Sequence, residues 1–490
     1  MAGIGFELKK VFKRNSVVGT LKGYAISGVV VTGPMFLSIT LLIGLRHIYE
    51  GFGIHMTAER EMISCLITYA TLFSVVWVNT FSIVVIRYVS DALYLNQYEK
   101  VMPSFYGSIS LLLLFGEVIF GLFLLIMRIP TKALFLSLVL FAIYVVVWMQ
   151  INYLSSIKNY KGLLTAFAAA VAIGLLVGYL LIKFFKGDVS YAIIIAVIFT
   201  YTILAVCNQI MLAQFFPKGK GSMFAFLEVF ETHSNLFITG LFMQMGLYGH
   251  IIVMWLSPAG EVVSHGLRQC TTYDMPAMVA FLTGIVTMIN IVVSLEVNFY
   301  QYFSRYLNLL NKGSIVEIKN AEERMKESLY DEIYYCVAKQ FLVTISCIVF
   351  GSMLLRSSFF GMTEEMIGIF RVLCVGYGAY ACGYALVLVM FYLNYKKVYV
   401  VMAVFAACTI LLGFVFSLGP ESLYGVGFTI SGIVLFISSL FFLRIYMKDV
   451  LLHIFVDQQM IKENTGFMTR LARKSEELYP FKDTERKAEA

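Results

Sequence analysis

Four acidic residues lie inside or at the edge of long apolar stretches of this chain. Glu117 occupies the middle of the run LLLLFGEVIFGLFLL, and Glu296 lies within VVSLEVNFYQYF. Glu228 and Glu231 are three residues apart at the start of another stretch, so on a helix they share one face. An ionised side chain at the centre of a bilayer costs about 2.5–3.5 kcal/mol, so such a residue usually faces a cavity or a partner. The four acids are therefore candidates for the lining of a transport pathway.

Side-chain amides within the apolar stretches form a second set of candidates. Gln150 and Asn290 are predicted to line the same aqueous path as the acids. Five further amides are candidates of the same kind: Asn79, Asn152, Asn208, Gln209 and Gln244. Each amide has an alternative role, because hydrogen bonds between membrane helices also use such side chains and contribute about 0.6 kcal/mol apiece.

Some of the charged residues have a purely structural interpretation. Acids at the start of a helix interact favourably with its dipole, which accounts for Glu228 and Glu231 as well as a cavity does. Arg87 and Asp91 are four residues apart and predict a structural ion pair on one helix.

Tyrosine is concentrated in two short segments, Phe299–Tyr306 and Tyr377–Tyr384. Interfacial belts of aromatic residues occur in membrane proteins, but these segments exceed what a belt needs. Tyrosine rings along a cavity would suit a sugar, which stacks its C–H faces on aromatic rings and bonds through its hydroxyls. Packing between helices and contact with lipid are the alternative roles.

Twelve apolar stretches of helical length position these residues. A helix needs about 20 apolar residues to cross the hydrocarbon core of a bilayer. The stretches are Thr20–Leu45, Met62–Ile86, Ser104–Met127, Ala133–Leu154, Leu163–Ile182, Tyr191–Phe215, Leu227–Leu256, Met275–Phe299, Val337–Leu355, Met366–Tyr392, Val398–Ser417 and Leu423–Leu443. Strands of a membrane barrel would be about 10 residues long with alternating polarity. With 60% hydrophobic residues, 14% charged residues and a mean hydropathy of +0.82, the chain is predicted to be an all-α polytopic membrane protein.

The basic residues predict the orientation of these helices. About 27 of the 37 lysines and arginines fall on the side that holds both chain ends. Basic residues accumulate in cytoplasmic loops, so both termini are expected in the cytoplasm and the protein in the cytoplasmic membrane. The net charge of +7 is then explained by loops next to an anionic leaflet, and no nucleic-acid partner is expected.

Polar segments divide the chain into expected parts. Residues 1–18 form an amphipathic cytoplasmic segment, and residues 19–216 hold the first six spans as an N-lobe. Residues 217–447 hold the other six as a C-lobe, interrupted by a charged cytoplasmic loop at 304–332. Residues 448–490 form a cytoplasmic tail.

Signatures of soluble enzymes do not occur in the sequence. It has no Gly-rich phosphate loop, no HExxH and no GxSxG motif. The eight cysteines have no CxxC spacing, and the six histidines have no ligand spacing on a helix. We therefore expect no catalysis, no metal and no cofactor.

Three sequence features together resemble a known family. They are the opening GIGFELKKVFKRNS, the turn Thr32-Gly33-Pro34 within the first span, and the run Arg87–Tyr94 (RYVSDALY). In kind and order they resemble the PelG family, the polytopic components of Pel exopolysaccharide export systems. The resemblance extends over the twelve spans and the charged loop after the eighth.

The resemblance carries expectations about fold and partners. It implies membership of the MOP flippase superfamily, which includes the Wzx and MATE proteins, with two six-helix lobes around a central cavity and no enzymatic activity. The implied cargo is an amino-sugar polymer rich in N-acetylgalactosamine and partly deacetylated, and the buried acids would offset its charge or couple to protons. The implied partners are a cytoplasmic glycosyltransferase and membrane subunits that include a cyclic di-GMP receptor.

Other functions fit the residues as well. A MATE-like antiporter would export cationic small molecules in exchange for Na⁺ or H⁺. A scaffold would hold a polysaccharide synthase together without transporting anything, and a membrane-embedded transferase is the remaining option. A dedicated exporter of Pel-type polysaccharide is the function that the sequence favours.

Overall fold

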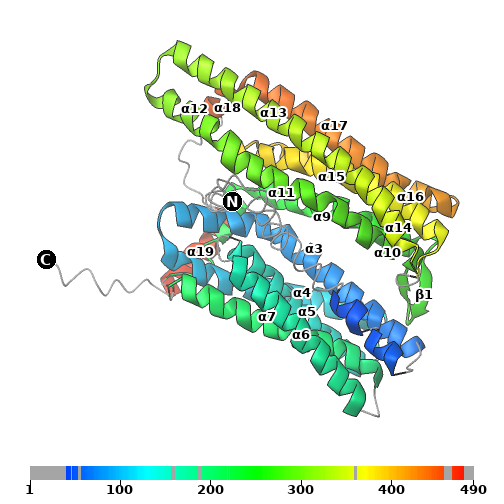
Figure 1. Cartoon of the computed structure of the whole chain (residues 1–490). Helices are drawn as coiled ribbons and strands as arrows, with labels where there is room; N and C mark the ends of the chain where they lie inside the picture. Colours follow the sequence, from blue (N-terminus) through cyan, green and yellow to red (C-terminus); the bar gives the residue numbers. More distant parts are fainter. Residues whose placement is uncertain are drawn as a thin grey trace.

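The computed structural model of the chain describes residues 40–45, 47–52, 57–155, 160–184, 189–217, 219, 221–357, 361–456 and 466–478. Within these ranges, ten helices are long and apolar enough to cross a membrane. Figure 1 shows two helical bundles, one from α3 to α7 and one from α9 to α17. The predicted all-helical, polytopic architecture is confirmed. The amphipathic segment expected at residues 1–18 lies outside the described residues.

The first bundle consists of long helices joined by short connections. Its elements are α3 (Ala58–Tyr94), η1 (Tyr98–Lys100), α4 (Val101–Ile126), α5 (Thr131–Leu154), α6 (Tyr160–Phe184), η2 (Val189–Tyr191) and α7 (Ala192–Phe215). Helix α5 packs between α3 and α7, and α7 packs on α6. Asn96 follows the C-cap of α3 with a φ of 57°, the left-handed conformation that commonly ends a helix.

The second bundle contains more elements, among them one small hairpin. They are α9 (Ser234–Leu256), β1 (Glu261–Ser264), β2 (Leu267–Gln269), α10 (Thr271–Phe281), η3 (Leu282–Gly284), α11 (Ile285–Val293), η4 (Ser294–Phe299), α12 (Tyr300–Lys312), α13 (Ile315–Ser346), η5 (Cys347–Gly351), α14 (Ser352–Leu355), α15 (Glu364–Tyr392), α16 (Val398–Ser417), η6 (Glu421–Leu423) and α17 (Val426–Lys448). The antiparallel strands β1 and β2 pair Glu261 with Gln269. Helix α16 packs on α9 and α17, and α15 packs on α17 and α10.

Ten of the predicted apolar stretches coincide with the long helices. The first stretch lies mostly outside the described residues. The stretch Met275–Phe299 is not one uninterrupted α-helix, because a 3₁₀ turn (η3) separates α10 from α11 and a π-helical segment (η4) follows. At the 3₁₀ turn the Thr283 carbonyl accepts a hydrogen bond of 3.1 Å from Gln340 Nε2 on α13, which ties the break to a neighbouring helix.

The stretch expected at Leu227–Leu256 is also divided. Helix α8 (Leu227–Thr232) ends at His233, whose φ and ψ of −130° and 43° are not helical, and α9 starts immediately afterwards. Two tail helices follow α17, namely α18 (Val450–Val456) and α19 (Phe467–Leu478). Glu231 of α8 accepts a hydrogen bond of 3.1 Å from the Thr469 backbone N–H and a second from the Thr469 hydroxyl. Glu231 therefore anchors the tail helix α19 to the connection between the bundles.

This anchor gives the first prediction. Glu231→Ala removes the carboxylate that accepts from both the Thr469 N–H and the Thr469 hydroxyl, at a cost of about 1–3 kcal/mol. Trypsin is expected to cut at Arg473 and Lys474 in α19 about tenfold faster in this variant. Glu228→Ala is the matched control, because Glu228 is exposed on the same helix. Equal cleavage rates in the two variants would contradict the anchoring role.

The two bundles meet most closely along α3 and α9. A Cβ atom added to Gly240 of α9 would lie 2.6 Å from the backbone carbonyl oxygen of Thr80 on α3. Real Cβ atoms essentially never approach another atom so closely. The absence of a side chain at Gly240 therefore sets the distance between the bundles at this point.

Candidate functional site

A cavity of about 1620 Å³ lies between the two bundles. One wall is formed mainly by residues from α3 and α5, and the other mainly by residues from α9, α10, α11 and α15 together with the connection after α15. The cavity extends from the region of Arg87, near the end of α3, to the β1–β2 hairpin. We call these the Arg87 end and the hairpin end, and we call the part between them the central zone.

The Arg87 end opens to solvent and carries positive charge. Its lining includes Tyr94, which is 86% exposed, and the exposed residues Lys396 and Lys397. Arg87 Nε lies 3.1 Å from Asp91 Oδ2, the geometry of an i,i+4 ion pair. Burial lowers the pKa of His233 below its ordinary value, and the nearby Arg87 cation lowers it further.

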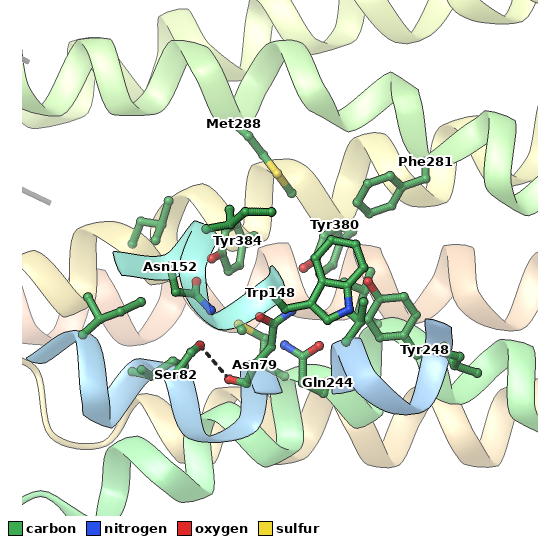
Figure 2. Close-up of a pocket in the computed structure, with 18 of the residues that line it drawn as sticks. Asn79, Ser82, Trp148, Asn152, Gln244, Tyr248, Phe281, Met288, Tyr380 and Tyr384 are labelled. Atoms are coloured by element: carbon green, nitrogen blue, oxygen red, sulfur yellow. Dashed lines mark hydrogen bonds between the residues drawn. The ribbon is translucent and has the colours of Figure 1, made fainter. Parts of the chain in front are cut away.

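The central zone carries a few polar side chains among mostly apolar ones. Figure 2 shows Asn79 of α3, Asn152 of α5 and Gln244 of α9 around one space, with Tyr380 and Tyr384 of α15 across from them. Among the described lining residues, the arginine, lysine and aspartate side chains lie towards the ends of the cavity: Arg87, Lys396 and Lys397 at one end and Asp274 at the other.

Aromatic rings of the central zone are fixed by their neighbours. Trp148 Nε1 donates a hydrogen bond of 2.9 Å to Ser74 Oγ. Tyr380 stacks on Tyr384 with ring centroids 5.8 Å apart and on Phe405 at 5.6 Å. Rings held in this way lose little conformational entropy when a ligand binds, which favours recognition.

The hairpin end is closed by contacts between the bundles. The ring of Tyr69 on α3 stacks on Trp255 of α9 with centroids 4.6 Å apart. The Tyr69 hydroxyl donates a hydrogen bond of 2.8 Å to the Arg268 carbonyl of β2. Arg268 Nη2 in turn donates to the carbonyls of Ser257 and Gly260 at 3.0 and 2.7 Å, which holds the hairpin against the end of α9. We call the contacts of Tyr69 with Trp255 and Arg268 the hairpin closure.

Asp274 supports the hairpin closure from the side of α10. Its Oδ2 accepts a hydrogen bond of 2.8 Å from Trp255 Nε1 and one of 3.2 Å from the Cys270 backbone N–H. Its Oδ1 is buried and has no hydrogen-bond partner in the described part of the chain. Asp274 is thus the one acidic residue among the described lining residues. It positions the Trp255 ring, which stacks on Tyr69.

A buried histidine joins three helices beside the cavity. His250 of α9 is 1% exposed, and its two ring nitrogens lie 2.7 Å from the Tyr273 hydroxyl and 3.2 Å from the Tyr377 hydroxyl. Both hydroxyls belong to the second bundle, so these contacts cross-link α9, α10 and α15. The histidine is a packing element with satisfied hydrogen bonds.

The predicted cavity residues of the first bundle lie elsewhere. Glu117 of α4 is not among the described lining residues, and its buried Oε1 has no hydrogen-bond partner within the described ranges. Gln150 Nε2 donates to the Ala205 carbonyl at 3.0 Å and to Gln209 Oε1 at 3.1 Å, so Gln150 joins α5 to α7. These contacts direct the Gln150 amide to a neighbouring helix and away from the cavity.

Three of the predicted residues of the second half, Asn290, Glu228 and Glu231, are not among the described lining residues. Asn290 is buried on α11 with its Oδ1 3.5 Å from Lys339 Nζ on α13. Glu228 is exposed on α8, and Glu231 binds Thr469. Glu296 lies in η4, and its side chain is outside the described residues. For Glu117, Glu228, Glu231, Glu296, Asn290 and Gln150, a role in the pathway stays a prediction.

Other sequence candidates do line the cavity. Tyr377, Tyr380 and Tyr384 come from the tyrosine-rich segment, and Asn79, Asn152 and Gln244 come from the wider set of amides. Sequence reasoning missed Asp274 and Trp148. Asp274 is three residues after the threonine that begins α10 and directly precedes the apolar stretch that starts at Met275. An acidic residue next to a predicted span was the one signal that could have identified it as a lining residue.

A helical membrane protein with two bundles around a central cavity has the architecture of MATE transporters. An outward-facing multidrug resistance MATE transporter of the MOP superfamily matches with a TM-score of 0.54 and 12% identity over 87% of this chain and 96% of that chain. An inward-facing MATE transporter matches with a TM-score of 0.55 and 11% identity over 85% of this chain and 95% of that chain. A eukaryotic MATE transporter matches with a TM-score of 0.55 and 13% identity over 93% of this chain and 99% of that chain. The chain therefore has the fold of this class of transporter, whose members have twelve helices in two lobes.

The family follows from the sequence. The PelG family, described as "Putative exopolysaccharide Exporter (EPS-E)", matches residues 1–455, so the chain belongs to this family. None of the curated proteins matches the chain. Family and fold together indicate a multi-pass membrane transporter rather than an enzyme.

Proposed function

We propose that this protein moves a Pel-type exopolysaccharide through the cavity and across the cytoplasmic membrane. The observation that carries the proposal is the cavity itself, about 1620 Å³ of space between two bundles. Pockets for drug-sized ligands typically measure about 300–1,000 Å³. The cavity therefore exceeds the needs of one small molecule and accommodates several linked sugar units.

The chemistry of the lining supports a saccharide cargo. Amides of Asn79, Asn152 and Gln244 offer donors and acceptors for hydroxyl groups, and Tyr380 and Tyr384 offer ring faces. A sugar presents both kinds of surface at once. A purely apolar drug would leave the three amides without hydrogen-bond partners. Each polar group that stays unsatisfied would cost about 1–3 kcal/mol of binding free energy.

The orientation that we propose places the Arg87 end at the cytoplasm. Arg87, Lys396 and Lys397 surround this end, and basic residues accumulate on the cytoplasmic side of membrane proteins. The sugar polymer would then enter at the open Arg87 end and leave past the hairpin closure. Both chain termini lie in the cytoplasm in this arrangement.

The protein would act within a synthesis and export complex. The partners that we propose are a cytoplasmic glycosyltransferase and membrane subunits that include a cyclic di-GMP receptor. Support comes from family membership and from the turn between α12 and α13, where Ile315 and Val316 are 60% and 64% exposed. Figure 1 shows this turn at the opposite end of the second bundle from the β1–β2 hairpin.

A cavity-filling substitution tests the transport function. Asn152→Trp places an indole in the central zone and is expected to reduce secreted polysaccharide at least tenfold, with the polymer retained inside the cell. Secreted and retained polymer are measured in a producing strain whose own gene is replaced by the variant. Blocking the path leaves synthesis intact, which separates a transport defect from a scaffold defect.

The control is Leu114→Trp on α4, where the replaced side chain is 61% exposed on the outer surface of the first bundle. Both variants are compared at equal membrane content. Normal secretion by Asn152→Trp at this content would overturn the proposal that the polymer passes through the cavity.

A further inference from the structure

Gln244 places a side-chain amide with an unsatisfied oxygen in the wall of the central zone. It is 2% exposed, and its Oε1 has no hydrogen-bond partner within the described ranges, although the residue lines the cavity. Buried polar atoms in folded proteins are almost always hydrogen-bonded. An acceptor left unpaired costs about 1–3 kcal/mol, so a ligand that donates a hydrogen bond to Oε1 after the amide turns toward the cavity would recover this cost.

Trp148 provides a rigid ring on α5 near this amide. Its Nε1 is fixed by Ser74, and its ring is supported by Tyr144 at 5.9 Å and Tyr201 at 6.2 Å between centroids. Trp148 nevertheless lines the cavity. Figure 2 shows Trp148 and Gln244 directed into the same space, with Tyr380 on another side of it.

The arginine, lysine and aspartate residues of the lining lie towards the two ends of the cavity. Arg87 follows Asn79 by eight residues on α3, which corresponds to about 12 Å along a helix. Trp255, the partner of Asp274, follows Gln244 by eleven residues on α9, or about 16 Å. An ammonium or carboxylate group held beside Gln244 would therefore lose water without gaining a charged partner, which is costly in a buried site.

We infer that the central zone contains a subsite for one uncharged sugar ring, in which Trp148 stacks on the ring and the Gln244 amide turns to bind a hydroxyl or amide N–H through Oε1. The inference rests on the proposed function and names the residues that recognise the cargo. It differs from the sequence expectation, in which buried acids offset a charged polymer. In this subsite the polymer is recognised through its neutral units.

Binding of oligosaccharides tests the subsite. The probes are short fragments of the polymer that the host secretes, one sample fully N-acetylated and one fully de-N-acetylated. Calorimetry with the full chain in nanodiscs is expected to show tighter binding of the neutral fragments. Gln244→Leu and Trp148→Leu should each weaken that binding about tenfold, whereas Gln214→Leu, at an exposed position near the end of α7, should leave it unchanged.

A charge exchange at the same position separates recognition from a structural effect. Gln244→Glu keeps the shape of the side chain and adds a negative charge, so neutral fragments should bind at least tenfold more weakly and cationic fragments more tightly than to the wild type. A loss of fold would weaken both. An unchanged preference in Gln244→Glu, wild-type affinity in Gln244→Leu, or no binding of neutral fragments by the wild type would overturn the subsite.

Failure of the subsite is distinguishable from failure of the proposed function. If Asn152→Trp blocks secretion while the Gln244 variants bind neutral fragments normally, the polymer passes through the cavity without this subsite. If Asn152→Trp secretes normally, the transport path itself is elsewhere.

Discussion

Gly240→Ala is expected to reduce polysaccharide secretion at least tenfold without preventing insertion into the membrane. The added Cβ would lie 2.6 Å from the Thr80 carbonyl oxygen and 3.3 Å from its carbon. Both atoms belong to the backbone of α3, so no side chain can rotate to make room. Overpacking of this kind costs about 1–3 kcal/mol, and here it forces the two bundles apart at their closest contact.

The transport that we propose requires the bundles to change their relative position, so a small displacement at α3 and α9 should alter the balance between conformations. A bias of about 1–3 kcal/mol corresponds to about 5–150-fold in such an equilibrium. Gly249→Ala on the same helix is the matched control, because a Cβ there meets Ile410 Cγ1 at an ordinary 3.4 Å. Secretion and membrane content are measured for both variants. Equal secretion would show that the Thr80 contact does not limit movement.

The apolar stretches predicted the architecture because length and hydropathy alone decide whether a helix can cross a bilayer. They did not predict the breaks at His233 and at η3, where local conformation and contacts from α13 interrupt the helix. The stretch from Met275 carried one signal of irregularity, Pro276 in the first turns of α10.

The candidate site was harder to predict than the fold. Both sides of a membrane helix are apolar, so periodicity does not tell which side faces a cavity and which faces another helix. Gln150 and Gln244 look alike in sequence, and the Oε1 of each is buried without a partner in the described part of the chain, yet Gln150 donates to α7 whereas Gln244 lines the cavity. Tyr380 and Tyr384 were identifiable because a dense tyrosine segment is unusual, whereas Trp148 gave no such signal.

Asp274→Leu is expected to open the hairpin closure. The substitution removes the carboxylate that accepts hydrogen bonds from Trp255 Nε1 and the Cys270 backbone N–H, and it leaves two buried donors at a cost of about 1–3 kcal/mol each. Trp255 then loses the contact that orients its ring against Tyr69. The closed arrangement should therefore be populated less in the variant.

The thiol of Cys270 reports on this opening. Cys270 is 1% exposed, and burial raises the pKa of its thiol, so the closed protein should react slowly with a maleimide for two reasons. Opening exposes the sulfur and relieves the burial that raises its pKa. We expect at least tenfold faster labelling of Cys270 in Asp274→Leu, measured by peptide mass spectrometry, because each 1.4 kcal/mol corresponds to about tenfold.

Controls distinguish opening at the hairpin from general unfolding. Cys336 on α13 is 3% exposed and distant in sequence from the closure, so its labelling should stay at the wild-type rate. Asp331→Leu, at an exposed position on the same helix, should leave Cys270 unreactive. Asp274→Asn retains one acceptor oxygen, so the labelling rate of Cys270 in this variant should fall between those of the wild type and Asp274→Leu. If Cys270 in Asp274→Leu reacts at the wild-type rate, the carboxylate does not hold the closure, and Tyr69 and Arg268 alone keep this end shut.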